Sequence, residues 1–358
     1  MEMIEMLTAL TKDNQLVIAD KKLRKKDSYF CPVCHKQVRL RRGKILLPHF
    51  AHRQNAACFA LLENESERHL VGKLAILNFF KGANLEGDLE VYFPAIQQRP
   101  DVLLTNGQHQ TAIEFQCSPL SAERHKQRNK GYQSLKIPVI WILGEPYLER
   151  KLTGDKIAQF AYFRKNLGIY LLYWRSKLQV LEVHYQLKID CSQKIYYQVM
   201  QFSTYYDYAK WLSSAQISVK ASKGNLSVYR KLMKQIQTGI FYNSTNYRSW
   251  QNYCYVRGSS LMQIPHWLFQ DLQIKPLFRQ SNVIWGKLVI VTIQADYHNE
   301  LLLEDYLNIC RRITDLLGGP YNFLQIPNAE KWYDDFYKKF YMMLMQNLML
   351  KIKNKSAM

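Results

Sequence analysis

The stretch RPDVLLTNGQHQTAIEFQCS, residues 99–118, has the pattern of a two-stranded hairpin. Its first strand, Asp101–Leu104, is short and apolar, and the residues after it have the composition of a turn. The second strand, Thr111–Cys117, alternates between polar and apolar residues. Because alternate residues of a strand point to opposite faces of a sheet, Glu114 and Gln116 lie on the same face.

Two carboxylates and an amide on paired strands suggest a metal site. An ordinary strand has no need of Glu114 and Gln116 on one face, with Asp101 at the start of the neighbouring strand. Carboxylates that converge from paired strands can bind Mg²⁺ or Mn²⁺ through hard oxygen atoms and leave room for water and a phosphate oxygen. The pattern is loose, and the solvated edge of an ordinary sheet explains it equally well, so both interpretations stay open at this point.

The charge balance of the chain favours a polyanionic partner. The chain has 358 residues, with 49 Lys and Arg against 29 Asp and Glu, which gives a formal net charge of +20. A surplus of this size suits nucleic acid or an anionic membrane surface. Apolar residues make up 47% of the chain, enough to form the cores of two or three domains.

Several sequence features indicate that the polyanionic partner is nucleic acid and not a membrane. The longest apolar runs, such as 137–143, are far too short to span a bilayer. The N-terminal residues lack the basic and apolar segments of a secretory signal. Seven cysteines without a framework-like spacing suit a reducing interior. We therefore expect a cytoplasmic protein that binds DNA and no membrane.

The segment 1–58 has the spacing of a basic, zinc-ribbon-like module. A CxxC pair places two thiolates on a tight turn about one metal ion, and a pair of histidines follows after the length of a small hairpin. The candidate zinc ligands are Cys31, Cys34, His49 and His52, with Cys58 as a substitute. The histidines are spaced by two residues, whereas classical fingers use three to five, so a ribbon without metal is the alternative.

A helix is expected over residues 61–80, where leucines recur at helical spacing. Glu65, His69 and Lys73 recur every four residues and therefore line one face. Glu67 lies on the opposite shoulder, so the pattern does not say which glutamate approaches a metal. Pairing of Glu and Lys on an exposed face is the alternative explanation, but the histidine within the row favours a site.

A strongly basic helix is expected directly after the hairpin, over residues 120–136. Arg124, Arg128 and Tyr132 share a face at four-residue spacing, and only one acid accompanies the bases of this segment. A phosphate-facing surface explains this composition at least as well as a solvated one. A buried strand over 137–143 follows, so the expected order of the central region is helix, three strands, helix, strand.

The rest of the chain, 151–358, carries no motif that points to a site. We expect a hairpin over 169–187 and a C-terminal helix over 330–353 with an aromatic stripe in the core. Tyr, Lys and Arg interleave in the later segments, as in proteins that stack and clamp single strands, but nothing in the pattern singles out a surface.

Three segments of the chain resemble the CoiA family of competence proteins. They are CPVC…HFAH over 31–52, ESERHLVGK over 65–73, and RPDVLL…AIEFQCSPLS over 99–121. The resemblance implies a nuclease-like domain with a PD-(D/E)xK-type, restriction-endonuclease-like αβββαβ core. Mapped by that pattern, Asp101 and Glu114 would bind Mg²⁺ or Mn²⁺, and Glu65 or Glu67 would be the helix carboxylate, with His69 beside them.

The resemblance contains one departure from the nuclease pattern. Gln116 stands where such nucleases usually have a lysine, which orients the attacking water and offsets negative charge. Glutamine can hydrogen-bond the water but carries no charge. Arg128 or Lys126 on the following helix could supply that charge, which is a hypothesis at this stage.

The sequence thus predicts a mixed α/β chain with three parts: the ribbon-like module 1–58, a nuclease-like domain 59–150, and a largely helical domain 151–358. The resemblance implies a role in natural transformation, as a metal-dependent deoxyribonuclease that acts on single-stranded or branched DNA alongside a RecA-type recombinase. The alternatives are a DNA-binding accessory of recombination with weak or no hydrolysis and a zinc-ribbon protein that acts through protein partners. The expected DNA contacts are Arg41, Arg42, Lys73, Arg99, Arg124, Lys126, Arg128 and Tyr132.

Overall fold

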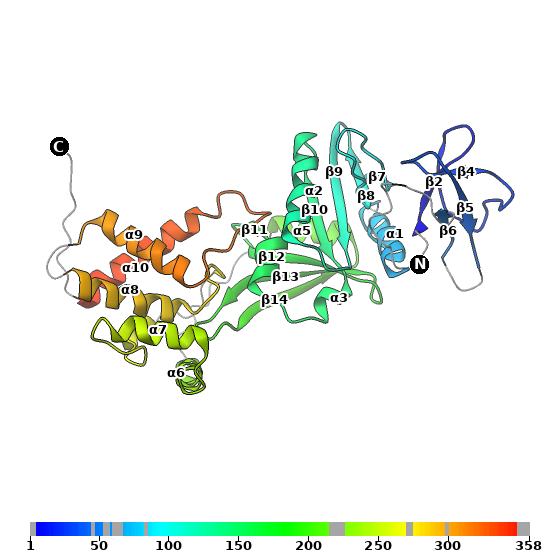
Figure 1. The fold of residues 1–358 in the computed structure, drawn as a ribbon. Coiled ribbons are helices and arrows are strands. Elements are labelled where there is room, and N and C mark those ends of the chain that lie inside the picture. Colours follow the sequence, from blue (N-terminus) through cyan, green and yellow to red (C-terminus); the bar gives the residue numbers. More distant parts are fainter. Residues whose placement is uncertain are drawn as a thin grey trace. The chain divides into compact units, whose positions relative to one another are not determined.

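The computed structural model describes residues 5–43, 47–52, 58, 67–81, 85–214, 226–269, 275–297 and 301–348. Helices and strands are both well represented, which confirms the predicted mixed α/β class (Figure 1). The chain forms two compact units. The first comprises residues 1–151, 171–184 and 199–215, and the second comprises 152–170, 185–198 and 216–358.

The N-terminal module is a six-stranded antiparallel sheet. Its strands are β1 (Glu5–Met6), β2 (Thr8–Leu10), β3 (Leu16–Ile18), β4 (Tyr29–Phe30), β5 (Gln37–Arg41) and β6 (His49–His52). They are arranged in the order β1-β6-β5-β4-β2-β3. Met6, Tyr29 and Phe50 are buried in one small core together with Cys31, so the CxxC turn is part of the module's interior.

The central region has the predicted αβββαβ order. Its elements are α1 (Glu67–Lys81), β7 (Glu86–Leu89), β8 (Val102–Asn106), β9 (His109–Gln116), α2 (Ala122–Ser134) and β10 (Val139–Leu143). Strands β7, β8 and β9 are antiparallel, and β10 runs parallel to β9. Gly107 adopts a positive φ of 59° in the tight turn between β8 and β9, a conformation that glycine adopts without steric cost.

Alternation along β9 sends its two faces to two different helices. Phe115 packs against Gly72 of α1, where a Cβ atom would overlap its ring. Ala112 packs against Tyr132 of α2. Because Phe115 is one residue from Glu114, Glu114 lies on the face covered by α2.

The central sheet continues beyond residue 150. The strands that extend it are β12 (Gly168–Arg175), β13 (Val180–Ile189) and β14 (Ile195–Phe202), and the full order is β14-β13-β12-β10-β9-β8-β7. The predicted hairpin over 169–187 corresponds to β12 and β13. Short elements surround these strands: α3 (Glu145–Leu148), α4 (Gly154–Phe160), β11 (Tyr162–Arg164), which pairs with β12, and α5 (Tyr205–Ser214).

The second unit is largely helical. Its helices after residue 216 are α6 (Leu226–Phe241), α7 (Thr245–Tyr255), the 3₁₀ helix η2 (His266–Phe269), α8 (Asn282–Asp296), α9 (Leu303–Leu316) and α10 (Lys331–Leu348). Helix α8 is buried from Val283 to Ile293, and Trp285 stacks on Tyr337 of α10. The expected aromatic stripe therefore packs in a core within α10, whereas residues 349–353 of the expected helix lie outside the described residues. Within the described residues, no helix is both long and apolar enough to cross a membrane.

Candidate active site and metal centre

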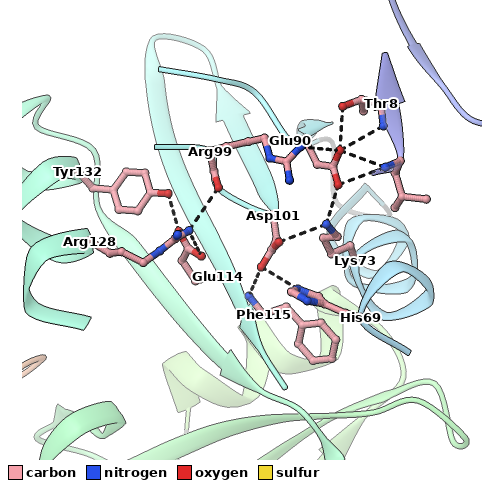
Figure 2. A network of polar contacts seen from close by, with 11 residues as sticks. Thr8, His69, Lys73, Glu90, Arg99, Asp101, Glu114, Phe115, Arg128 and Tyr132 are labelled. Carbon is pink, nitrogen blue, oxygen red and sulfur yellow. Dashed lines mark hydrogen bonds and ion pairs between the residues drawn. The ribbon is translucent and has the colours of Figure 1, made fainter. Parts of the chain in front are cut away.

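Asp101 precedes β8, and its carboxylate faces helix α1 (Figure 2). The register of β8 and β9, continued by one pair, sets Asp101 opposite Glu114. Asp101 Oδ2 accepts the N–H of Phe115 at 2.7 Å and lies 3.2 Å from His69 Nε2, while Lys73 Nζ lies 3.4 Å from Oδ1. Burial by itself would raise the pKa of Asp101, but the charges of His69 and Lys73 hold it below its ordinary value.

Glu114 is held by two residues of α2. Arg128 Nη2 donates to both carboxylate oxygens, at 2.5 and 2.6 Å, and the Tyr132 hydroxyl donates to Oε1 at 2.5 Å (Figure 2). Burial raises the pKa of Glu114 to about 7, while Arg128 opposes the rise and the negative charge of Asp101 adds to it. The carboxylate therefore has a fixed orientation within the protein.

The other residues predicted to act in catalysis lie differently. The Gln116 amide donates to the carbonyl and hydroxyl oxygens of Ser118, at 2.7 and 3.1 Å. The Gln116 side chain therefore binds the residues that directly follow β9, and no hydrogen bond between its amide and Asp101 or Glu114 is found among the described residues. Glu65 lies outside the described residues, and Glu67 begins α1 with a side chain that is likewise not described. That Glu65 or Glu67 is the helix carboxylate of the site stays a prediction.

A buried glutamate that the sequence analysis did not single out connects the N-terminal module to this site. Glu90 follows β7 and accepts the N–H of Leu7 at 3.1 Å, the N–H of Thr8 at 3.1 Å and the Thr8 hydroxyl at 2.9 Å. Lys73 Nζ lies 2.6 Å from Glu90 Oε1, and Arg99 Nη1 lies 3.4 Å from Oε2 (Figure 2).

The charges on Lys73 and Arg99 explain the ionisation of Glu90. Burial alone would raise the pKa of Glu90, but these two cations lower it to about 2. Lys73 therefore stands between two carboxylates, Glu90 and Asp101. Local periodicity carries no signal for this network, because Glu90 and Thr8 are far apart in the sequence.

Two of the predicted DNA contacts are wrong, because their side chains are buried. Lys73 and Tyr132 are both 0% exposed, and their polar groups bind the internal carboxylates described above. They position Glu90, Asp101 and Glu114 and are not available to DNA in this structure. Helical spacing places residues on one face of a helix, but it does not tell whether that face meets the sheet or the solvent.

The remaining predicted DNA contacts are partly or fully exposed. Arg99 and Arg128 are half-buried and engage carboxylates. The Arg42 guanidinium donates to the carbonyl oxygens of Lys21 and Leu23. Arg41 and Lys126 are exposed, and Arg124 is half-buried.

Four potential zinc ligands converge at the CxxC turn of the N-terminal module. The ligand atoms of Cys31, Cys34, His52 and Cys58 all lie within 4.8 Å of one another, and theirs is the one such group of three or more found among the residues that the structure describes. The sulfur atoms of Cys31 and Cys58 are 3.8 Å apart. Two thiolates at Zn–S distances of about 2.3 Å in a tetrahedral site are separated by about 3.8 Å, so the spacing fits zinc.

The local structure supports this ligand set. The N–H of Val33 points to Cys31 Sγ at 3.4 Å, and His35 closes the turn with a positive φ of 53°. Burial lowers the pKa of His52, which favours the neutral imidazole that binds metal. None of the seven cysteines, all of which the structure describes, forms a disulfide.

One predicted zinc ligand is corrected. His49 is not in the group, and its Nδ1 lies 2.9 Å from the carbonyl oxygen of Leu47. His49 and His52 belong to the same strand, β6, where residues three apart point to opposite faces. Cys58, the substitute ligand in the prediction, completes the set in its place.

Two protein-family models match successive parts of the chain. A family described as "Competence protein CoiA, N-terminal domain" matches residues 14–60, and one described as "Competence protein CoiA, nuclease-like domain" matches residues 65–219. The second range includes strands β12–β14, in agreement with the extended sheet.

A curated relative supports the same assignment. The chain is 34% identical over 139 residues to "Competence protein CoiA" of Bacillus subtilis (strain 168). The match covers 39% of this chain and 37% of that protein, so it spans well under half of the relative's length. No solved structure matches the chain significantly. On these matches and on the segments quoted above, the chain belongs to the CoiA family of competence proteins and contains that family's nuclease-like domain.

Proposed function

We propose that this chain is a metal-dependent deoxyribonuclease that processes DNA during natural transformation. The observation that carries the proposal is the placement of Asp101 and Glu114 in the αβββαβ core: both carboxylates are buried, Asp101 just before β8 and Glu114 on β9, close enough for the negative charge of Asp101 to raise the pKa of Glu114. Buried acids that serve only the fold are uncommon, because burying a charge costs free energy unless a function or a partner compensates for it.

The donor set suits a hard divalent cation. Carboxylate oxygens are preferred ligands of Mg²⁺ and Mn²⁺, and Asp101 and Glu114 would hold the ion. When bound, such an ion supplies positive charge and a water molecule of lowered pKa for attack on a phosphodiester. His69 and Lys73 orient Asp101, whereas Arg128 and Tyr132 orient Glu114. A cation must share Glu114 with Arg128, which already contacts both of its oxygens.

Helix α2 supplies the contact with the DNA backbone in this proposal. Arg124, Lys126 and Lys130 bring positive charge to the helix that holds Glu114, and at least the two lysines are exposed. Phosphate contacts of this kind position nucleic acid without reading its sequence. The proposed substrates are single-stranded or branched DNA at the recombination step, where a RecA-type recombinase acts.

We assign zinc a structural role. Four protein ligands close the coordination shell of the site at Cys31, Cys34, His52 and Cys58, whereas catalytic zinc sites leave one position open. Zinc would therefore stabilise the N-terminal module, whose Leu7 and Thr8 bind Glu90.

A second candidate function is a DNA-binding accessory without hydrolysis. Two observations favour it: Arg128 contacts both oxygens of Glu114, and Gln116 turns its amide toward Ser118. In this case protein cations take the place of metal, and the nuclease-like fold acts as a clamp on DNA.

Cleavage assays separate the two candidates. Labelled single-stranded, duplex and branched DNA is incubated with the purified chain in Mg²⁺ or Mn²⁺. The variants are Glu114→Gln and Asp101→Asn, and Glu123→Gln, at an exposed acid of α2, is the matched control. The nuclease proposal expects cleavage by the wild type and the control and none by the two site variants, with DNA affinity retained. If the wild type binds DNA and cuts none of the substrates, the proposal fails and the clamp takes its place.

A further inference from the structure

A long segment, most of it in the second unit, has a charge composition unlike the rest of the chain. Residues 208–270 contain no Asp or Glu. The same segment has eight basic residues: Lys210, Lys220, Lys223, Arg230, Lys231, Lys234, Arg248 and Arg257. Positive charge is therefore not offset by acids along this part of the sequence, which includes the helices α6 and α7.

Helices α6 and α7 form a hairpin with a defined buried side. Gly239 of α6 lies against the ring of Tyr247 of α7, where a Cβ atom would overlap the ring. Ile236 of α6 and Cys254 of α7 are fully buried, and Tyr253 of α7 is hydrogen-bonded to Thr292 of α8 at 2.7 Å. The packing of these residues fixes which faces of the two helices point to solvent.

The solvent-facing side presents aromatic rings. Phe241, Tyr242 and Tyr255 are 76%, 75% and 75% exposed. Exposed apolar side chains that lie together, unlike single scattered ones, indicate an interaction site. Phe241 and Tyr242 also contact each other edge-on, with ring centroids 5.1 Å apart. Tyr255 ends α7, which begins just after Tyr242, so the rings stand at the two ends of a helix that is about 16 Å long.

Basic side chains lie on the same faces as these rings. Arg230 and Lys234 of α6 precede Phe241 by eleven and seven residues, which places all three on one face. Arg248 precedes Tyr255 by seven residues on α7. All three bases are exposed, and none takes part in an ion pair within the described part of the chain.

We propose that this outer surface, formed by Arg230, Lys234, Phe241, Tyr242, Arg248 and Tyr255, is a binding site for single-stranded nucleic acid. We call it the α6–α7 surface. The bases of a single strand would stack on the aromatic rings while Arg and Lys contact the phosphates, which is the combination used by proteins that bind single strands without sequence preference. A duplex keeps its bases stacked inside and would use only the positive charge. Its residues belong to the second unit and do not include the carboxylates of the proposed nuclease, so the proposal does not depend on hydrolysis.

Binding measured without divalent cations tests the α6–α7 surface independently of cleavage. The full chain is titrated into a labelled single strand of about 20 nucleotides, a length that exceeds common single-strand site sizes. Phe241→Ala combined with Tyr255→Ala is expected to weaken binding about tenfold or more, because each stacked ring is lost. Affinity for a duplex of the same length should change by less than about twofold.

A second pair of variants tests the charge. Arg230→Gln combined with Lys234→Gln should reduce the slope of log affinity against log salt by about 1.4, since each phosphate contact to a single strand contributes about 0.7. The matched controls lie outside the surface: Tyr206→Ala, at a residue 68% exposed on α5, and Lys331→Gln combined with Lys338→Gln, at exposed residues of α10. Both controls should bind like the wild type.

Several outcomes are informative. Equal losses for DNA and RNA strands, or a loss for DNA alone, support the proposal and define the kind of strand. Unchanged single-strand affinity in the aromatic variant overturns it, and so does an equal loss for duplex. If the variants instead lose binding to vesicles with anionic lipid and keep their affinity for single strands, the surface contacts a membrane and the proposal is wrong.

Discussion

Replacing Glu90 by glutamine should destabilise the first unit by about 3–5 kcal/mol. Glu90 is 1% exposed, and its carboxylate binds Lys73 and Arg99 as well as two backbone N–H groups of the N-terminal module. Removing one partner of a buried ion pair leaves the other charge poorly compensated, which costs about 3–5 kcal/mol. The pKa of Glu90 gives a consistent figure, since a fall from 4.5 to about 2 corresponds to about 3 kcal/mol.

The sign of the pH dependence follows from the same shift. The folded-state pKa of Glu90 lies below its ordinary value of 4.5, so the ionised carboxylate stabilises the fold fully above that value. This contribution is lost as the pH falls from about 4.5 toward 2. The free energy of unfolding of the wild type should therefore fall more steeply over this range than that of Glu90→Gln.

The energetic coupling between Glu90 and Lys73 is measured by urea unfolding of four proteins: the wild type, Glu90→Gln, Lys73→Met and the double variant. Because the double variant removes both charges of the pair, its cost should be smaller than the sum of the two single costs by about 1–3 kcal/mol. Lys73 also lies 3.4 Å from Asp101, so some cost persists in the double variant. A cost below about 1 kcal/mol for Glu90→Gln, or strictly additive costs, would refute the argument that the charges of this buried pair stabilise the first unit.

Two further predictions address the metal centre and the amide at the end of β9. Cys58→Ser should contain less zinc than the wild type and have a lower melting temperature, whereas His49→Ala should keep its zinc, because Cys58 and not His49 belongs to the four-ligand group. Elemental analysis of both purified variants measures the zinc content. Loss of zinc from His49→Ala alone would contradict the prediction. Gln116→Ala should change the rate of DNA cleavage by less than about threefold, because the Gln116 amide binds Ser118 rather than a reacting group. A loss of cleavage as large as that of Glu114→Gln would contradict this and show that the side chain turns toward the site when substrate binds.

The fold of the central region was predictable because its signals are local. Alternation in residues 111–117 assigns Phe115 and Glu114 to opposite faces, and the structure covers those faces with α1 and α2. The order of helices and strands also follows from short patterns. The extension of the sheet by β12–β14 was harder to predict, since only the pairing of β10 with β12 across an intervening helical segment joins the two parts.

The network around Asp101 could not be predicted in the same way. Lys73 carries a charge and has helical spacing with Glu65 and His69, which suggests an exposed face, yet it is fully buried. Its charge is paired with Glu90, which lies beyond the next strand and in turn binds Thr8 of another sheet. Spacing along one helix contains no information about partners at such distances along the chain. Of the predicted zinc ligands, only His49 lies outside the group of potential ligands, and the reason is related: whether His49 and His52 converge depends on whether that segment is a strand or a turn.

The structure also changes what the net charge implies. Lys73, Arg99 and Arg128 contribute to the +20, but they lie against Glu90, Asp101 and Glu114, so their charge is largely compensated inside the first unit. Attraction to a polyanion must therefore come from bases that lack acidic partners and reach solvent. Helix α2 offers such bases beside the proposed nuclease site, and the acid-free segment 208–270 offers others on α6 and α7. A nuclease that acts on single strands would gain affinity from a second surface that is selective for unstacked bases, because positive charge alone does not distinguish a single strand from a duplex.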